Sequence, residues 1–224
     1  RLENEITGEI LVPELHADIP KHRYVEAEKM ASTLNGDFGS FPWHNTTSPM
    51  TKSNVDGLIG RTWKPTLSVV GSDGIPSIQN GGNVLRPYTK LKLSFRLPPV
   101  VDCNIAMNAV DKILKENPPN NASVTVDWDE PANGWNAPKL STWLEGAIEE
   151  ASQSFYRKPA MAMGEGGTIP FMAMLGEQFP AAQFVVTGVL GPNSNAHGPN
   201  EFIHIPFAKK LSASIAYILD RYPS

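Results

Sequence analysis

The clearest pattern along the chain is a strict alternation of apolar and polar residues over residues 90–97. Alternation with a period of two predicts a β-strand with one buried face, and it places Arg96 on the opposite, polar face. The buried face would carry Leu91, Leu93, Phe95 and Leu97. A second strand is expected over residues 66–70, with Gly81-Gly82 marking the turn between the two strands.

Helical spacing follows these strands over residues 105–114. The apolar positions of this predicted helix are Ile105, Ala109, Val110, Ile113 and Leu114. Residues 124–128 then alternate again, which predicts a further strand. The order strand, strand, helix, strand is typical of an antiparallel sheet with helices on one face.

The rhythm changes after residues 130–135, a stretch with Pro131 and Gly134 that is typical of a domain boundary. Helices are expected over residues 138–155, 168–177 and 206–219, and short strands over residues 160–163 and 184–190. Alternating helices and strands predict a mainly parallel α/β layer. We therefore predict two domains with different architectures, residues 1–130 and residues 131–224.

Two loops leave the carboxyl ends of the predicted parallel strands, Gly164–Thr168 and Gly191–His197. Ligands usually bind at this edge of a parallel sheet, so we expect the two loops to converge. His197 ends the second loop, and a neutral imidazole is a common metal ligand. One histidine does not define a zinc site, which needs three or four ligands, so a surface histidine without a role stays open.

Two further features suggest binding of anionic groups. In the turn Gly164–Thr168, backbone N–H groups at the start of the next predicted helix could bind an anion, and Thr168 is a suitable N-cap for that helix. A flexible turn without a ligand explains the sequence equally well. The turn lacks the Lys-Ser/Thr ending of a nucleotide-binding loop. The Arg96 guanidinium has the shape to hold a carboxylate with two hydrogen bonds, and a solvated arginine is the alternative.

Composition narrows the class of protein. The chain has 224 residues, of which 41% are hydrophobic and 19% charged, as in an ordinary globular protein. The net charge of -4 gives no basis for nucleic-acid or membrane-surface binding, and no apolar run approaches the roughly 20 residues that span a bilayer. The single cysteine, Cys103, excludes an internal disulfide and a cysteine-based zinc site, and it favours a cytoplasmic location.

Three motifs in the chain resemble those of a known enzyme family. In chain order they are Gly82-Asn83-Val84-Leu85 with Lys92-Leu93-Ser94-Phe95-Arg96-Leu97-Pro98-Pro99, then Glu165-Gly166-Gly167-Thr168-Ile169-Pro170, then Ala196-His197-Gly198-Pro199-Asn200-Glu201. They are similar to motifs of the metallopeptidase family that includes carnosinase, carboxypeptidase G, aminoacylase and succinyl-diaminopimelate desuccinylase. The resemblance extends over roughly residues 60–220 and is less distinct before residue 60.

The resemblance implies a fold, an activity and partners. Residues 1–130 would form a lid and dimerisation domain that is incomplete at its N-terminus, and residues 131–224 would form the C-terminal portion of the catalytic domain. In this family a pair of divalent metal ions, usually zinc, assists cleavage of amide bonds in small peptides or N-acyl amino acids. A homodimer through the lid domain is expected, without nucleic acid or membrane.

The resemblance also implies roles for individual residues. His197 matches the last metal ligand of the family. Asn83 and Arg96 match lid residues that hold substrate, and Gly167 and Thr168 match the turn that receives the substrate carboxylate.

The chain departs from the family in one large respect. The family's other metal ligands and its general-base glutamate belong to motifs that lie N-terminal to the part of the family that this chain resembles. The pair Glu149-Glu150 is no substitute, because it is expected on the exposed side of a helix. We therefore expect this chain alone to be inactive and to bind no metal tightly. A non-catalytic dimerisation module and a carboxylate-binding module are the alternatives.

Overall fold

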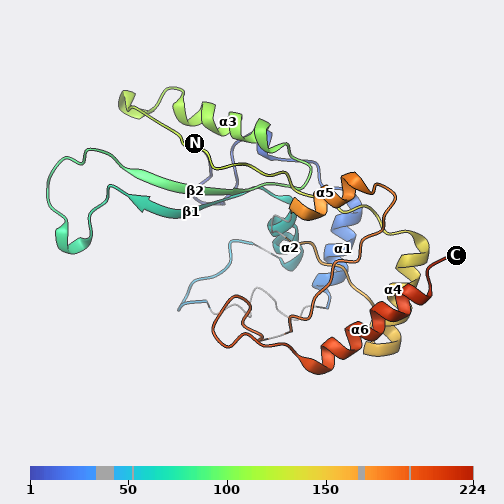
Figure 1. Ribbon diagram of the computed structural model, residues 1–224. Coiled ribbons are helices and arrows are strands. Elements are labelled where there is room, and N and C mark those ends of the chain that lie inside the picture. Colours follow the sequence, from blue (N-terminus) through green and yellow to red (C-terminus); the bar gives the residue numbers. More distant parts are fainter. Residues whose placement is uncertain (34–42, 52, 166–169, 192, 224) are drawn as a thin grey trace. The chain divides into compact units, whose positions relative to one another are not determined.

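The structure is a computed structural model that describes residues 1–33, 43–51, 53–165, 170–191 and 193–223 (Figure 1). The chain divides into two units. The first unit comprises Arg1–Asn136 and Met163–Met174, and the second comprises Ala137–Ala162 and Leu175–Ser224.

A β-hairpin dominates the first unit. Strand β1 (Thr66–Asp73) pairs antiparallel with strand β2 (Lys90–Arg96), so that Thr66 lies opposite Arg96 and Asp73 opposite Lys90 (Figure 1). A β-bulge between Val69 and Gly71 shifts the register, and bulges of this kind increase the local twist. The antiparallel pair predicted from the alternation is confirmed.

Helix α3 (Cys103–Lys115) covers one face of this hairpin. It begins after Asp102, whose Oδ1 accepts hydrogen bonds from the backbone N–H groups of Asn104 and Ile105 at 2.8 and 3.0 Å. The shared core consists of Leu2, Ile10, Val12, Leu15, Val101, Ala106 and Val110, with Leu93, Phe95 and Leu97 packed against it.

Two apolar positions of the predicted buried faces lie outside this core. Leu91 is 50% exposed and Ile105 is 58% exposed, so their predicted burial is wrong. Leu91 pairs with Ser72 near the loop end of the hairpin. Ile105 lies in the first turn of α3, whose buried residues are Cys103, Ala106 and Val110.

The strand predicted over residues 124–128 is not formed in the described part of the chain, where this segment has no strand pairing. Side chains join it to β2 instead, through Lys90–Asp127 at 3.5 Å and Lys92–Asp129 at 3.3 Å. The matching order of the two pairs means that the segment runs parallel to β2. A strand requires hydrogen bonds from a neighbouring backbone, and alternation in the sequence does not supply that neighbour.

Trp128 fixes the same segment to α3. Its indole Nε1 donates to Asp111 Oδ1 at 3.1 Å, and Lys115 Nζ lies 2.9 Å from the same oxygen. The contact with Lys115 and the bond from Trp128 together hold the pKa of the Asp111 carboxyl below its ordinary value.

The first unit also contains two helices that the sequence pattern did not reveal, α1 (Lys21–Ala31) and α2 (Asn54–Trp63). They pack through a small cluster of Ala27, Leu58, Ile59 and Trp63. Helix α2 begins after Ser53, whose Oγ accepts a hydrogen bond from the Asp56 N–H at 3.1 Å. Short 3-10 turns lie at η1 (Pro13–Leu15), η2 (Ile78–Asn80) and η3 (Pro119–Asn121).

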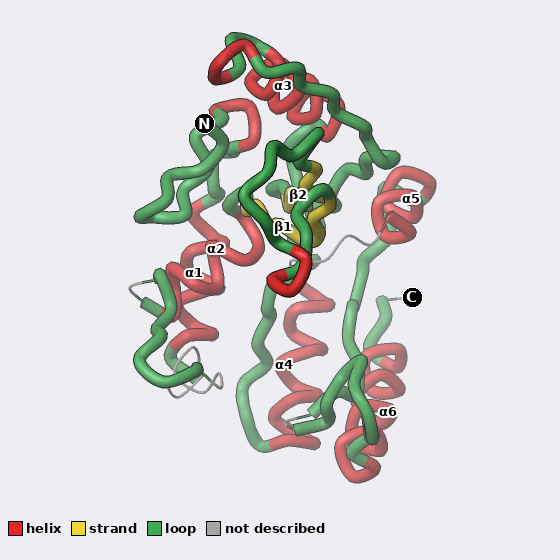
Figure 2. Tube along the Cα trace, turned by 90° about the vertical axis from the view of Figure 1, so that its left-hand side faces the viewer, coloured by secondary structure: helices red, strands yellow, loops and turns green. Residues whose placement is uncertain are grey.

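Two helices, α4 (Thr142–Tyr156) and α6 (Ile205–Asp220), form the second unit and pack against each other (Figure 2). The buried face of α4 carries Leu144, Ala147 and Ala151. Aromatic contacts join the pair at Trp143–Tyr222, Phe155–Tyr217 and Tyr156–Phe207. The helices predicted over residues 138–155 and 206–219 are confirmed, although the first begins four residues later than expected.

The parallel strands predicted over residues 160–163 and 184–190 are not formed among the described residues. Val186 and Leu190 are 60% and 59% exposed. The apolar run is real, but a parallel strand forms only beside another strand, and the described part of this unit provides none. The third predicted helix is present as α5 (Pro170–Gln178). No described helix is long and apolar enough to cross a bilayer.

Candidate functional site

His197 lies in a loop that is closed by its own hydrogen bonds. The backbone carbonyl of Asn195 accepts from the Gly198 N–H at 2.9 Å, and the Asn195 side-chain Nδ2 donates to the Pro199 carbonyl at 2.7 Å. The Glu201 carboxylate Oε2 accepts the backbone N–H of His197 at 3.2 Å. We call residues 194–202 the His197 loop, because Phe202 N–H closes it on the Ser194 carbonyl at 3.2 Å. The His197 side chain is exposed.

The backbone of this loop repeatedly adopts the left-handed conformation. Asn195, His197 and Asn200 have φ of 54°, 62° and 59°. Asparagine tolerates this region, whereas for other residues with a Cβ it costs about 1–2 kcal/mol. Backbone strain of this kind clusters at functional sites, which makes His197 a stronger candidate than an ordinary surface histidine.

The described residues supply no complete metal site. No group of three or more histidine, cysteine, aspartate or glutamate side chains lies together in the described part of the chain. The imidazole of His197 is accessible and suits one position in a metal's coordination shell, but zinc needs three or four protein ligands. The donor set therefore fits one ligand of a larger site.

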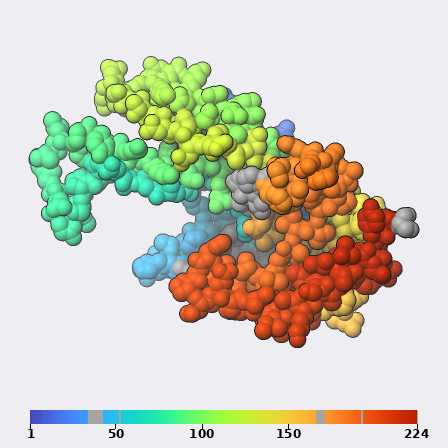
Figure 3. Space-filling model, viewed as in Figure 1, coloured from blue at the N-terminus to red at the C-terminus, as the bar shows by residue number. Residues whose placement is uncertain are grey.

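Asn83 and Arg96 lie at opposite ends of the hairpin. Arg96 is the last residue of β2, and Asn83 lies in the hairpin loop, residues 74–89, beyond the other end of the strands; both are exposed. Seven residues of β2 extend over about 20 Å. The structure therefore does not bring these two predicted substrate-binding residues together, and Figure 3 shows the loop projecting clear of α3.

The near end of the hairpin loop is held by Asp73, Gly74 and Tyr88. The Tyr88 hydroxyl donates to Asp73 Oδ2 at 3.1 Å. That hydrogen bond and the negative charge of Asp73 raise the pKa of the Tyr88 phenol. Gly74 has a φ of 77° and lies so close to the Tyr88 carbonyl that a Cβ would collide with it. These contacts close the base of the hairpin loop, at the end of the strands opposite Arg96.

Gly167 and Thr168, the predicted carboxylate-binding turn, lie outside the described residues. The residues just before them rest on α2. Arg61 Nη2 lies 3.1 Å from Glu165 Oε1, and a Cβ on Gly164 would come within 2.8 Å of Thr62 Cγ2. Arg61 could not be identified from the sequence, because its contact with Glu165 depends on how α2 packs.

The pair Glu149-Glu150 has structural partners in the second unit. Glu149 Oε2 accepts the backbone N–H of Ala160 at 2.9 Å. Glu150 Oε2 accepts the Tyr217 hydroxyl at 2.9 Å and lies 3.9 Å from Arg221 Nη2. Both carboxylates thus tie α4 to neighbouring segments, and Glu149 is half-buried, not exposed as expected.

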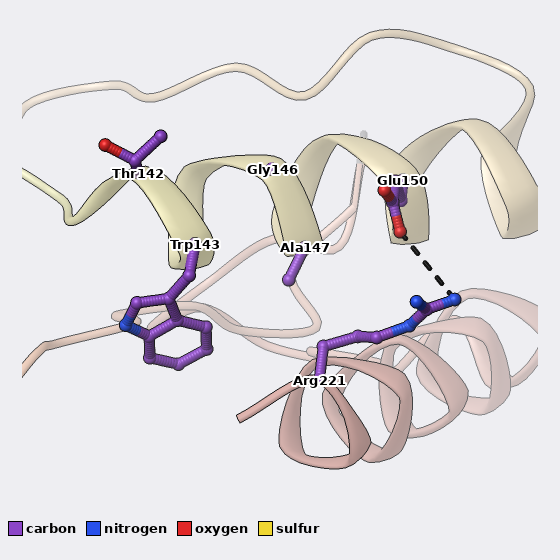
Figure 4. Close-up of a pocket in the computed structure, with 6 residues that line it drawn as sticks. All are labelled: Thr142, Trp143, Gly146, Ala147, Glu150 and Arg221. Atoms are coloured by element: carbon purple, nitrogen blue, oxygen red, sulfur yellow. Dashed lines mark ion pairs between the residues drawn. The ribbon is translucent and has the colours of Figure 1, made fainter. Parts of the chain in front are cut away.

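A shallow cleft of about 250 Å³ lies between α4 and α6 (Figure 4). Its lining consists of Thr142, Trp143, Gly146, Ala147, Glu150 and Arg221. The charged side chains of the cleft point toward each other, as the dashed ion pair shows. The cleft contains none of the predicted site residues, and its charged groups already satisfy each other, so we do not regard it as the reaction site.

Comparison with known proteins gives a consistent set of relatives. No family model matches the chain. A cysteinylglycine-S-conjugate dipeptidase from Corynebacterium striatum is 26% identical over 157 residues, covering 65% of this chain and 33% of the relative.

Three solved structures share the fold over nearly the whole chain. They are the dipeptidase Dug1p from Saccharomyces cerevisiae (TM-score 0.69, 19% identity), human carnosine dipeptidase 1 (0.64, 18%) and the metallo-carboxypeptidase Sso-CP2 from Sulfolobus solfataricus (0.65, 17%). They are covered to 46%, 46% and 49% of their lengths, while 99%, 98% and 97% of this chain is matched. The chain thus spans about a third of its curated relative and just under half of these structures. The sequence relative is thus a dipeptidase, and these structural neighbours are two dipeptidases and one metallo-carboxypeptidase of the M20 family, in agreement with the resemblance that the three motifs indicated.

Proposed function

We propose that this chain is the C-terminal part of a metal-dependent hydrolase that cleaves amide bonds of small peptides or N-acyl amino acids. The observation that carries the proposal is the fold match over at least 97% of the chain to three peptidases, joined by sequence similarity to a dipeptidase. Residues 1–130 would act as the lid and dimerisation domain and residues 131–224 as part of the catalytic domain. A cytoplasmic location agrees with the single cysteine.

His197 is the residue of this chain that would hold metal, as one ligand of a pair of divalent ions, with zinc the preferred identity. The support is its motif, its exposed imidazole and its strained backbone. Such a metal pair supplies Lewis-acid activation of the scissile amide carbonyl. The other ligands and the general base would come from a part of the enzyme outside this chain. Residues 1–224 alone should then bind zinc weakly and leave dipeptides intact.

Arg96 would bind the terminal carboxylate of the substrate. Its side chain is exposed at the end of β2, on the strand face opposite Phe95 and Leu97. A planar guanidinium can donate two parallel hydrogen bonds to a carboxylate. Gly167 and Thr168 would add backbone and hydroxyl donors to the same group.

Asn83 would serve a second copy of the chain. It lies in the loop beyond the far end of β2, a strand about 20 Å long that ends at Arg96, so we do not expect one small substrate to contact both residues of one chain. The hairpin loop also exposes large apolar side chains, with Ile78 at 96%, Val84 at 77% and Leu85 at 100%. A homodimer in which the loop reaches the partner's site would cover these side chains and place Asn83 beside a substrate.

The experiment that tests the proposal uses the full-length protein. We expect purified protein to retain divalent metal and to hydrolyse dipeptides or N-acyl amino acids, to lose activity on chelation, and to regain it with added zinc. His197→Ala should lower the metal retained through dialysis, while His22→Ala, a change of an exposed histidine on α1, should not. Binding of peptides without turnover would support the carboxylate-binding module instead. Unchanged metal retention in His197→Ala would remove His197 from the site.

A further inference from the structure

Glu201 makes an unusual contact for an exposed glutamate, since it binds the main chain of His197. Its Oε2 accepts the His197 N–H at 3.2 Å across four residues. The acceptor carries a charge, which makes the hydrogen bond stronger than one between neutral groups. Among the histidines in the described part of the chain, the bonded N–H belongs to the one with a left-handed backbone, φ 62°. The Glu201 carboxylate therefore stabilises the backbone conformation of the proposed metal ligand.

Asn195 makes the second set of contacts in the His197 loop. Asn195 precedes His197 by two residues and bonds to the two residues that follow it. Its carbonyl accepts from the Gly198 N–H at 2.9 Å, and its side chain donates to the Pro199 carbonyl at 2.7 Å. Only a side chain with a hydrogen-bond donor can make the second bond. The missing Cβ of Gly198 leaves the space that this side chain occupies, since an ideal Cβ there would lie 2.6 Å from Asn195 Nδ2.

Glu201 bonds the main chain of His197, and Asn195 bridges across it to Gly198 and Pro199, so both sets of contacts leave the imidazole accessible. A left-handed histidine persists only where its surroundings hold it. Among the described residues, Glu201 holds it through the His197 N–H, and Asn195 holds it by closing the turn across His197.

We infer that Glu201 and Asn195 are positioning residues, which clamp the main chain of His197 so that its imidazole is presented in one orientation. The inference rests on the proposed function of His197 as a metal ligand. It adds two residues that touch neither metal nor substrate and act through His197. Partners of this kind typically change metal affinity by about 10- to 100-fold when they are replaced.

The first test measures the clamp itself, in metal-free full-length protein. Amide hydrogen exchange at His197 should be faster in Glu201→Ala than in the wild type. Glu201→Gln keeps an oxygen acceptor and should exchange at a rate between the two. Glu145→Ala, which changes an exposed glutamate of α4, is the matched control and should leave the rate unchanged. Equal exchange in Glu201→Ala and wild type would overturn the inference.

The second test measures the consequence, as zinc affinity in competition with a chelator. Glu201→Ala and Asn195→Asp should each bind zinc about 10- to 100-fold more weakly, with an unchanged melting temperature of the metal-free protein. Asn195→Asp loses the donor to Pro199 and keeps the size of the side chain. Faster exchange combined with wild-type zinc affinity in both variants would also overturn the inference, since the clamp would then position nothing.

His197→Ala separates this inference from the proposed function. If that variant binds zinc like the wild type, His197 is not a ligand and the proposed function fails at this residue. If it loses zinc while Glu201→Ala and Asn195→Asp do not, the proposed function stands and the positioning role is wrong.

Discussion

Arg96 combines an exposed side chain with a rigid support, since β2 pairs with β1 along its whole length up to the Thr66–Arg96 pair. A residue of this kind can be changed without disturbing the core that Phe95 and Leu97 join. Its role in substrate binding can therefore be separated from any role in folding.

We expect Arg96→Ala in the full-length enzyme to lower kcat/KM by about one to two powers of ten, because one charge-assisted contact contributes about 1.5–3 kcal/mol. Arg96→Lys should recover only part of the loss, since an ammonium lacks the two-pronged geometry. Lys92→Ala, on the same face of β2, is the control and should keep normal activity. Steady-state kinetics and melting temperatures check this, and unfolding or unchanged activity in Arg96→Ala would count against the assignment.

At the scale of secondary structure elements, some elements follow from the local sequence pattern and others depend on tertiary contacts. The hairpin strands and helices α4 and α6 follow from apolar periodicity, because each buries one face. Helix α1 buries only Ala27, so its sequence carries no apolar stripe to detect. Residues 184–190 are apolar enough for a strand, but strand pairing depends on a neighbour that periodicity cannot reveal.

The candidate site likewise has features that the sequence predicts and features that only the folded structure shows. The motifs identified His197, Arg96 and Asn83 as residue types that suit metal and carboxylate binding. The separation of Asn83 from Arg96 was implicit in the predicted hairpin, because Asn83 adjoins the expected turn at Gly81-Gly82 and Arg96 lies at the far end of the strand that follows. The bonds from Glu201 and Asn195 were hidden, since they depend on the left-handed turns of the His197 loop.

The hairpin has its own sensitive position at Gly74. We expect Gly74→Ala to destabilise the protein by about 1–3 kcal/mol, because alanine is strained at a φ of 77° and its Cβ would meet the Tyr88 carbonyl. Gly82→Ala is the matched control in the same loop, with nothing within 4 Å of an added Cβ. Urea unfolding of both variants measures the difference. Equal stability of the two would show that the loop end relaxes freely.

At the scale of the whole molecule, the position of Asn83 predicts shared sites. If the hairpin loop serves the partner, each site combines Arg96 of one chain with Asn83 of the other. We expect Asn83→Ala and Arg96→Ala homodimers each to be impaired. Mixing the two chains and allowing subunit exchange should restore activity, because one of the two sites in each heterodimer then has both residues intact. No recovery in verified heterodimers would mean that each site uses a single chain.

The two units are interleaved along the chain, which crosses between them after Asn136, Ala162 and Met174. Neither unit is therefore a continuous piece of polypeptide. A protease that cuts near Asn136 would leave a C-terminal fragment that still contributes residues 163–174 to the first unit, so the nicked halves should copurify under native conditions. The same arrangement means that neither unit can be inherited or transplanted by a single recombination event, so the two are expected to evolve together.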